Sequence, residues 1–215
     1  MRIAPLLALA ALAYGSPALA GEGPFLSLSA GLSVPFDVNF HAKNGAGTNG
    51  KVSLRSAAEI AGELGYTLPD GILLSLEVAH AAFGAGHTTV NGMENAVLPG
   101  GYVSESAVLA NAAYEIPYRD NINWIFGAGA GLAQVSPDLF DEADNRLSGN
   151  KTTFTWQVLA GANWAFTPVL RLQLDYRFRS VLGTAHTYAG TPVQFGSLSS
   201  QALMLTLRWV LTAPV

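Results

Sequence analysis

The sequence predicts an all-β protein, namely an eight-stranded antiparallel up-and-down transmembrane β-barrel with short periplasmic turns and long extracellular loops. Three observations lead to this prediction. Apolar and polar side chains alternate with a period of two through eight segments of ten or more residues. The connections between these segments are alternately long and short. The composition is 50% hydrophobic and only 12% charged, whereas soluble domains average about 25% charged residues.

Residues 1–20 have the features of a secretory signal peptide. A short basic start, Met1-Arg2, precedes an apolar run from Ile3 to Tyr14, which is shorter than the ~20 residues of a membrane helix. The run ends in the small residues of Ala18-Leu19-Ala20, an Ala-x-Ala cleavage pattern. We therefore expect cleavage after Ala20 and a single outer-membrane β-barrel domain over 21–215.

The alternation is clearest in the segment Val169 to Ser180. Leu172, Leu174 and Tyr176 lie on one face of the predicted strand, and charged residues such as Arg177 lie on the other. A soluble sandwich strand shows the same pattern with its apolar face inward. A transmembrane barrel strand reverses it, with the apolar face in lipid and the polar face in the lumen. The other segments of the chain are therefore needed to distinguish a soluble strand from a transmembrane strand.

The other seven predicted strands are spread over the whole chain. They cover residues 25–34, 56–67, 72–83, 102–116, 123–135, 152–166 and 201–211. The long connections at 35–54, 84–101, 136–150 and 181–199 fall at one end of an up-and-down sheet, and the three short turns fall at the other. Outer-membrane barrels have this asymmetry, and the strand lengths match the roughly 9–11 residues that cross a bilayer.

The main structural alternative is a soluble eight-stranded barrel of the lipocalin type. Such a barrel needs an apolar interior and a polar exterior carrying many charges of both signs. Here the polar faces carry few charges, and many of these stand beside Gly or Ala. The apolar faces end in aromatic residues near the short turns, as expected of a girdle at a membrane interface. The predicted girdle consists of Tyr66, Tyr114, Trp164, Phe166 and Trp209.

The charged residues of the polar faces would meet inside the barrel, because an eight-stranded barrel is only wide enough for side chains to fill it. We expect them to form a structural ion-pair network whose pairing stays open, with Arg179 at the outer rim. Paired carboxylates can also serve acid–base catalysis, but pairing alone accounts for buried charges. The predicted lumen network consists of Glu59, Glu63, Glu77, Glu115, Arg171, Asp175, Arg177 and Arg208.

The chain resembles the OmpA-like family of eight-stranded outer-membrane β-barrels, which includes the opacity-protein and bacterial surface-antigen groups. The resemblance lies in the signal peptide, the amphipathic strands, the Leu-x-Leu-x-Tyr-Arg pattern of Leu172 to Arg177, the glycine-rich run 127–131 and the Arg208-Trp209 ending. It departs where Thr-Ala-Pro-Val follows Leu211, since such barrels usually end in an aromatic residue. The resemblance implies a monomer in the bacterial outer membrane, in contact with its lipid, with lipopolysaccharide and with the outer-membrane assembly machinery.

The leading functional interpretation is non-enzymatic. The barrel would support the envelope and contact host, phage or other cell-surface ligands through its four extracellular loops. The alternative is a narrow transport barrel for small or hydrophobic solutes. The chain has no cysteine and no basic stripe, which excludes thiol chemistry and nucleic-acid binding. We expect no cofactor and no metal, because the four histidines lack metal-ligand spacing and three of them, His41, His87 and His186, fall in predicted loops.

A third interpretation is an enzyme that modifies the acyl chains of lipid A. His80 has outward parity near the long-loop end of its strand, and Ser104 and Ser106 have outward parity on the next strand. A base beside a hydroxyl is the arrangement that nucleophilic catalysis needs. The His-x-Ser arrangement of deacylase barrels is absent, however, and no orienting acid is evident. Polar residues at a membrane interface are the simpler explanation of these catalytic candidates.

Overall fold

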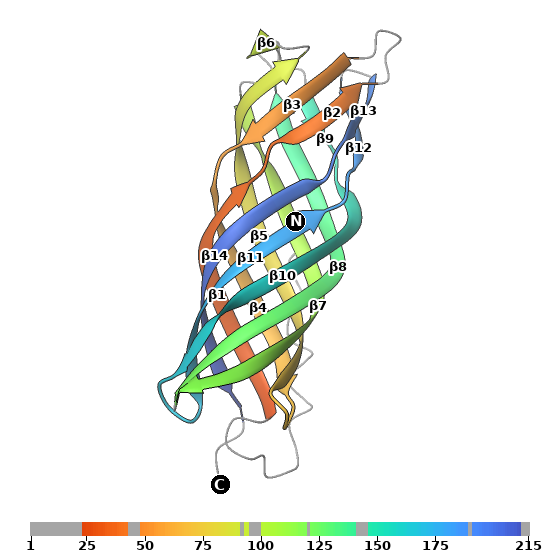
Figure 1. Ribbon diagram of the computed structural model, residues 1–215. Coiled ribbons are helices and arrows are strands. Elements are labelled where there is room, and N and C mark those ends of the chain that lie inside the picture. The colour runs from red at the N-terminus through yellow and green to blue at the C-terminus, as the bar shows by residue number, and fades with distance from the viewer. Residues whose placement is uncertain are drawn as a thin grey trace.

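The computed structural model describes residues 23–42, 48–90, 93–94, 100–119, 121–140, 146–188 and 191–211. Within these ranges the chain forms one antiparallel sheet of 14 strands that closes on itself (Figure 1). The expected signal peptide and the Thr-Ala-Pro-Val ending lie outside the described residues. No described helix is long and apolar enough to cross a membrane.

Eight strands form the lower ring in Figure 1, which we call the transmembrane ring. Each strand pairs with its neighbour along the chain, and the first pairs with the last to close the ring. These are the eight strands that the alternation predicts, and the fold class is confirmed. The strands are β1 (Gly23–Pro35), β4 (Ala57–Thr67), β5 (Ile72–Val90), β7 (Gly100–Arg119), β8 (Ile122–Phe140), β10 (Lys151–Ala165), β11 (Leu170–Val181) and β14 (Leu198–Val210).

A second ring of paired strands continues the barrel beyond the long-loop end, and we call it the collar; it closes through the part of β5 and β7 that is paired in the transmembrane ring. It runs in the order β5-β3-β2-β13-β12-β9-β8-β7 and back to β5, so β5, β7 and β8 belong to both rings. The two-residue β6 (Met93–Glu94) pairs with the end of β5. The strands added by the collar are β2 (Val38–Ala42), β3 (Thr48–Leu54), β9 (Arg146–Ser148), β12 (Ala185–Tyr188) and β13 (Thr191–Phe195).

The expectation that the four long connections are loops was therefore wrong in part. Three of them contribute new strands to the collar, and the second lengthens β5 and β7. The added strands have 3 to 7 residues, too few for a period of two to stand out from glycine and polar residues. Pairing with neighbouring strands supplies hydrogen-bond partners to their backbone groups outside the membrane.

The outer face of the transmembrane ring is apolar. Leu28, Ile60, Leu132 and Leu203 are 55%, 60%, 58% and 56% exposed, and similar side chains surround them on every strand. A continuous apolar belt of this size is not compatible with water on that face. The inner face carries the buried charges instead, so the lipocalin-type alternative is excluded and this ring lies in lipid.

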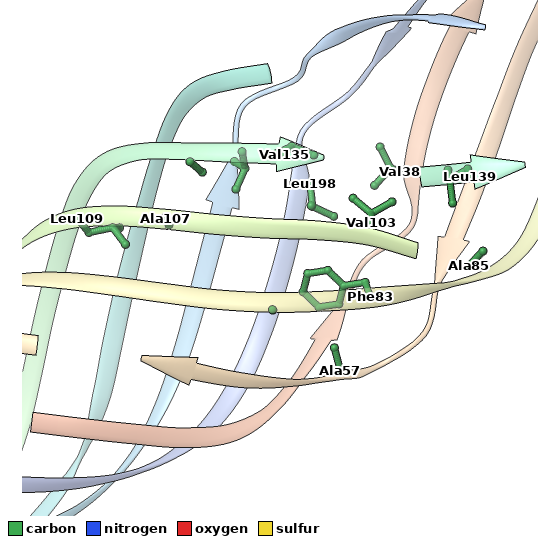
Figure 2. Close-up of a cluster of buried hydrophobic side chains, with 13 residues drawn as sticks. Val38, Ala57, Phe83, Ala85, Val103, Ala107, Leu109, Val135, Leu139 and Leu198 are labelled. Atoms are coloured by element: carbon green, nitrogen blue, oxygen red, sulfur yellow. The ribbon is translucent and has the colours of Figure 1, made fainter. Parts of the chain in front are cut away.

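The collar has the opposite polarity. On the β2–β3 hairpin, Val38 and Val52 pair with each other and are buried, whereas Asn39 and Lys51 form the next pair and are exposed. The Lys51 Nζ atom lies 2.6 Å from an oxygen of Asp37 on this outer surface. The inward Val38 joins a buried apolar cluster with Phe83, Val103, Ala107, Leu109, Val135, Leu139 and Leu198, most of which Figure 2 shows projecting into the barrel.

Candidate functional site

The lumen of the transmembrane ring is filled by charged and amide side chains, which we call the lumen plug. Its upper part surrounds Arg177 and Arg179 of β11. The Nη1 atom of Arg177 lies 2.9 Å from Glu77 Oε2, and its Nε lies 2.5 Å from Asp175 Oδ2. Arg179 lies 3.3 Å from Glu77 and 3.4 Å from Glu105. All five side chains are at least 95% buried.

Glu59 of β4 closes this upper part. One of its carboxylate oxygens lies 2.9 Å from Arg179 Nη2, although the N–H direction is too far off for a hydrogen bond. Two amides complete the arrangement. Gln157 donates to Glu77 at 3.2 Å and to Asn111 at 3.0 Å, and Asn111 donates to Glu77 at 3.3 Å. The carboxylate of Glu77 is therefore held from three other strands.

The lower part of the plug centres on Glu115 of β7. Arg171 lies 2.8 Å from one oxygen of Glu115, and Arg208 of β14 lies 2.5 Å from the other. Arg208 also donates to Gln173 Oε1 at 2.7 Å, and its guanidinium stacks over the ring of Phe25 with the carbon 4.9 Å from the centroid. A single carboxylate thus bridges two guanidinium groups just above the short turns.

Gln173 joins the two parts, because its Nε2 atom donates to Asp175 Oδ1 at 2.7 Å. The inward residues of β11, spaced two apart from Arg171 to Arg179, therefore form a continuous column along the lumen. Buried charges in such a column stabilise a fold when each is paired and hydrogen-bonded. The arrangement leaves most of the described plug side chains almost inaccessible to water.

The structure brings the residues of the predicted lumen network together, and Glu63 differs from the other members in its contacts. That carboxylate faces inward on β4 but accepts a hydrogen bond from the Ser75 hydroxyl, and it forms no ion pair within the described part of the chain. The expectation for Arg179 was wrong, since the side chain is buried in the plug and only 4% exposed. The strand continues to Val181, so Arg179 lies inside the lumen and not at its rim.

Sequence reasoning also missed Glu105, which pairs with Arg179. A signal was present, because Glu105 has the same odd parity as Leu109, Asn111 and Glu115 on one strand. Parity likewise places Arg179 on the face of Arg177. Glu105 and Arg179 were missed because the sequence prediction placed them at the end of their strands, beyond the part that lines the lumen.

The five predicted girdle residues are exposed on the outer face near the short turns. The rings of Trp164 and Phe166 lie 4.1 Å apart between centroids, and Tyr118 and Trp124 extend the same zone with centroids 5.7 Å apart. A second aromatic group lies at the collar end, where the ring of Phe178 is 6.1 Å from Phe36 and 5.6 Å from Trp156. Aromatic side chains thus border the apolar belt at both ends.

His80 lies on the outer face with an exposed side chain, and its Nδ1 atom is 2.9 Å from Ser106 Oγ of the adjacent strand. Ser104 is directed differently, because its hydroxyl donates to the Ser136 carbonyl at 3.4 Å. Among the described residues no carboxylate is bonded to His80. The pair is a base beside a hydroxyl without an orienting acid, and nothing in the described chain gives positive evidence of catalysis.

A partly open cavity of about 50 Å³ lies inside the collar, above the plug. Its wall includes Val38, Val103, Val135, Leu139 and Leu198, which Figure 2 shows directed into the same space. His186 also lines it and is only 6% exposed, and the prediction that this residue falls in a loop was wrong, because it lies in β12. Burial lowers the pKa of the His186 imidazole, and the positive charge of Lys151 lowers it further.

A closed strand barrel with an apolar outside, a plugged polar lumen and aromatic borders defines a small outer-membrane β-barrel protein. The model of the family described as "Outer membrane protein beta-barrel domain" matches residues 5–207, and the chain belongs to this family. The predicted location in the bacterial outer membrane is confirmed. No curated protein matches the chain at a significant level.

Solved structures of outer-membrane proteins share the fold at low sequence identity. Neisserial surface protein A (NspA) is 18% identical, and the alignment covers 88% of this chain and 99% of NspA with a TM-score of 0.52. OprG from Pseudomonas aeruginosa is 13% identical, with 87% and 96% covered and a TM-score of 0.55. At these identities the likeness shows the fold alone.

Proposed function

We propose that this protein is a non-enzymatic, non-conducting barrel of the outer membrane that carries the collar as a rigid surface for contact with ligands on host, phage or other cells. The observation that carries the proposal is the collar, whose paired strands extend the barrel beyond the apolar belt. Short flexible loops would connect the membrane strands equally well, whereas paired strands fix the position of their side chains.

The lumen plug supports the non-conducting part of the proposal. Buried guanidinium and carboxylate groups from five strands meet across the lumen, and each paired carboxylate or guanidinium of the plug is at most 5% exposed apart from Arg171. Moving an ion through this region would require breaking several buried pairs at a cost of several kcal/mol each. A transport barrel would instead leave a continuous path along its axis.

Adhesion measurements test the surface role. The full-length protein is expressed on a host strain that lacks adhesive barrels, and binding to epithelial cells and to bacterial cells is compared with that of a collar-shortened variant. In this variant short turns replace residues 37–54 and 183–196, so the transmembrane ring remains. We expect the variant to insert and to lose adhesion. Equal adhesion of the two proteins at equal surface density would overturn the proposal.

Planar-bilayer recordings test the closed lumen against the transport interpretation. The purified protein is expected to give no discrete conductance steps, whereas a transport barrel would give steps or saturable solute flux. Because the recording needs no surface ligand, it separates a failure of the closed-lumen proposal from a failure of the adhesion proposal.

A second candidate function is acyl transfer or hydrolysis on lipid A, favoured by the 2.9 Å contact between His80 and Ser106 on the lipid-facing surface. Mass spectrometry of lipid A from expressing cells tests it. Altered acylation that disappears in His80→Ala and Ser106→Ala would support this candidate, and unchanged lipid A in a competent host removes it. Ser104→Ala is a matched control, because that hydroxyl is bonded to a backbone carbonyl and not to His80.

A further inference from the structure

The collar cavity differs in chemistry from the lumen below it. Among the described residues its wall is apolar except for Thr184 and His186, and none of the described lining side chains is charged. The plug begins only deeper in the barrel, around Glu105 and Arg179. An ionic ligand would lose its hydration here without gaining a partner, so the cavity selects against charged molecules.

His186 supplies a polar group that the fold does not satisfy. Its Nε2 atom lies 2.9 Å from the Thr184 hydroxyl, but its Nδ1 atom is buried and has no hydrogen-bond partner among the described residues. The edge of the imidazole packs against the ring of Phe195, with the centroids 5.8 Å apart and the planes at 76°. An unpaired buried nitrogen costs free energy unless a ligand or a water bonds to it.

The tautomer of His186 determines which ligand group can form a hydrogen bond with its Nδ1 atom. If Thr184 donates to Nε2, then Nδ1 carries the proton and donates; if Nε2 donates to Thr184, then Nδ1 accepts. A hydroxyl can do either, because it has both a proton and lone pairs. Desolvation and the Lys151 charge keep the pKa of His186 low, so the imidazole is neutral at neutral pH and does not demand an anion.

From these observations we infer that the collar cavity is a binding site for small uncharged alcohols or phenols, whose hydroxyl bonds to His186 Nδ1 and whose apolar part packs against the aliphatic wall. The cavity volume of about 50 Å³ limits the buried part to a few heavy atoms, and the rest of the ligand extends toward the partly open side. This site goes beyond the contact function proposed for the outer surface of the collar and does not depend on it.

The four histidines make a site-resolved test feasible. The full-length protein in lipid nanodiscs is labelled with ¹³C at the Cε1 atom of histidine and titrated with phenol or with toluene, which has the same number of heavy atoms but no hydroxyl. We expect a saturable shift of the His186 resonance, with phenol binding about fivefold more tightly than toluene, the ratio expected for one net hydrogen bond. His80 on the lipid face and His87, which is also exposed, report partitioning into lipid and general surface effects.

Two matched variants keep the test decisive. Val52→Phe fills the cavity from its wall and should abolish the saturable shift while the His186 resonance remains in the spectrum. Val108→Phe places the same substitution on the lipid face, where Val108 is 54% exposed, and should leave binding unchanged. The inference is overturned if the shifts of His80, His87 and His186 rise in parallel without saturation, if toluene binds as tightly as phenol, or if Val52→Phe titrates like the unmodified protein.

Discussion

Arg177 and Glu77 are separated by 100 residues along the chain, yet the Nη1 atom of one lies 2.9 Å from the Oε2 atom of the other across the lumen. The contact joins β11 to β5, which are not neighbours in the sheet. It therefore ties together opposite sides of the transmembrane ring, which backbone pairing alone does not do.

Replacing Arg177 by methionine should lower thermal stability in detergent. The change keeps much of the side-chain volume but leaves Glu77 and Asp175 without their closest positive charge, and removal of one partner from a buried pair costs about 3–5 kcal/mol. Differential scanning calorimetry, or loss of the compact electrophoretic form on heating, measures the effect. Arg119→Met is the control, because Arg119 is exposed at the short-turn end. A melting temperature equal to that of the control would argue against a structural plug.

Gly129 should not tolerate alanine. A Cβ atom at this position would lie 1.8 Å from the side-chain oxygen of Asn111, the amide that donates to Glu77. Displacing Asn111 should destabilise the barrel by about 1–3 kcal/mol, the usual cost of overpacking. Gly62→Ala is the matched control, because its added methyl group would find its nearest neighbour, Leu28 Cδ2, at 3.8 Å on the lipid face. Urea-induced unfolding of the two variants in parallel compares their free energies, and equal values would contradict the predicted crowding.

A charge on the apolar belt should destabilise the barrel according to its depth. Leu205 lies in the middle of β14 and is 51% exposed, while Leu211 follows the end of that strand and is exposed to the same fraction. Leu205→Arg should cost about 2–4 kcal/mol and Leu211→Arg about 0–1 kcal/mol, because the penalty falls from the bilayer midplane to the interface. Folding equilibria in lipid vesicles provide the measurement. Equal losses of folding free energy in the two variants would contradict the placement of Leu205 near the middle of the bilayer.

The collar should open more readily at acidic pH. Because the pKa of His186 is lowered in the folded protein, the unfolded hairpin takes up a proton at a pH at which the folded one does not. Stability of the collar is therefore full above the ordinary histidine pKa of about 6.5 and decreases as pH falls from there toward the folded value. Hydrogen exchange of the β12 and β13 amides, corrected for the effect of pH on the intrinsic exchange rate, should show more frequent opening at the lower pH. His186→Gln should remove this dependence; if it persists there, another group is responsible.

The strands of the transmembrane ring could be predicted because each repeats one alternation over its whole length, and β10 and β11 were bounded to within a residue or two. The same parity identified most charged residues of the plug, although Glu105 and Arg179 were missed because the strands extend further than predicted. The pairing did not follow from parity, since Arg179 could face Glu59, Glu77 or Glu105 depending on the stagger between strands, which the sequence does not encode locally. The collar and the position of His186 were missed for a related reason. Strands such as β12 have 4 residues, and their pairing partners lie in other connections far along the chain.

The reversal of polarity along single strands has a mechanical consequence for how the protein sits in the bilayer. On β8 the outward side chains change from Leu132 to Gln134 and then Asp138 within seven residues. Sliding the barrel inward by one side-chain repeat, about 7 Å, would pull Gln134 toward the acyl chains, and sliding it outward would expose leucines to water. The barrel therefore has one preferred height, and a thinner or thicker membrane must adapt to it by compressing or stretching the surrounding lipid. Contacts made by the collar would then occur at a fixed distance above the lipid head groups.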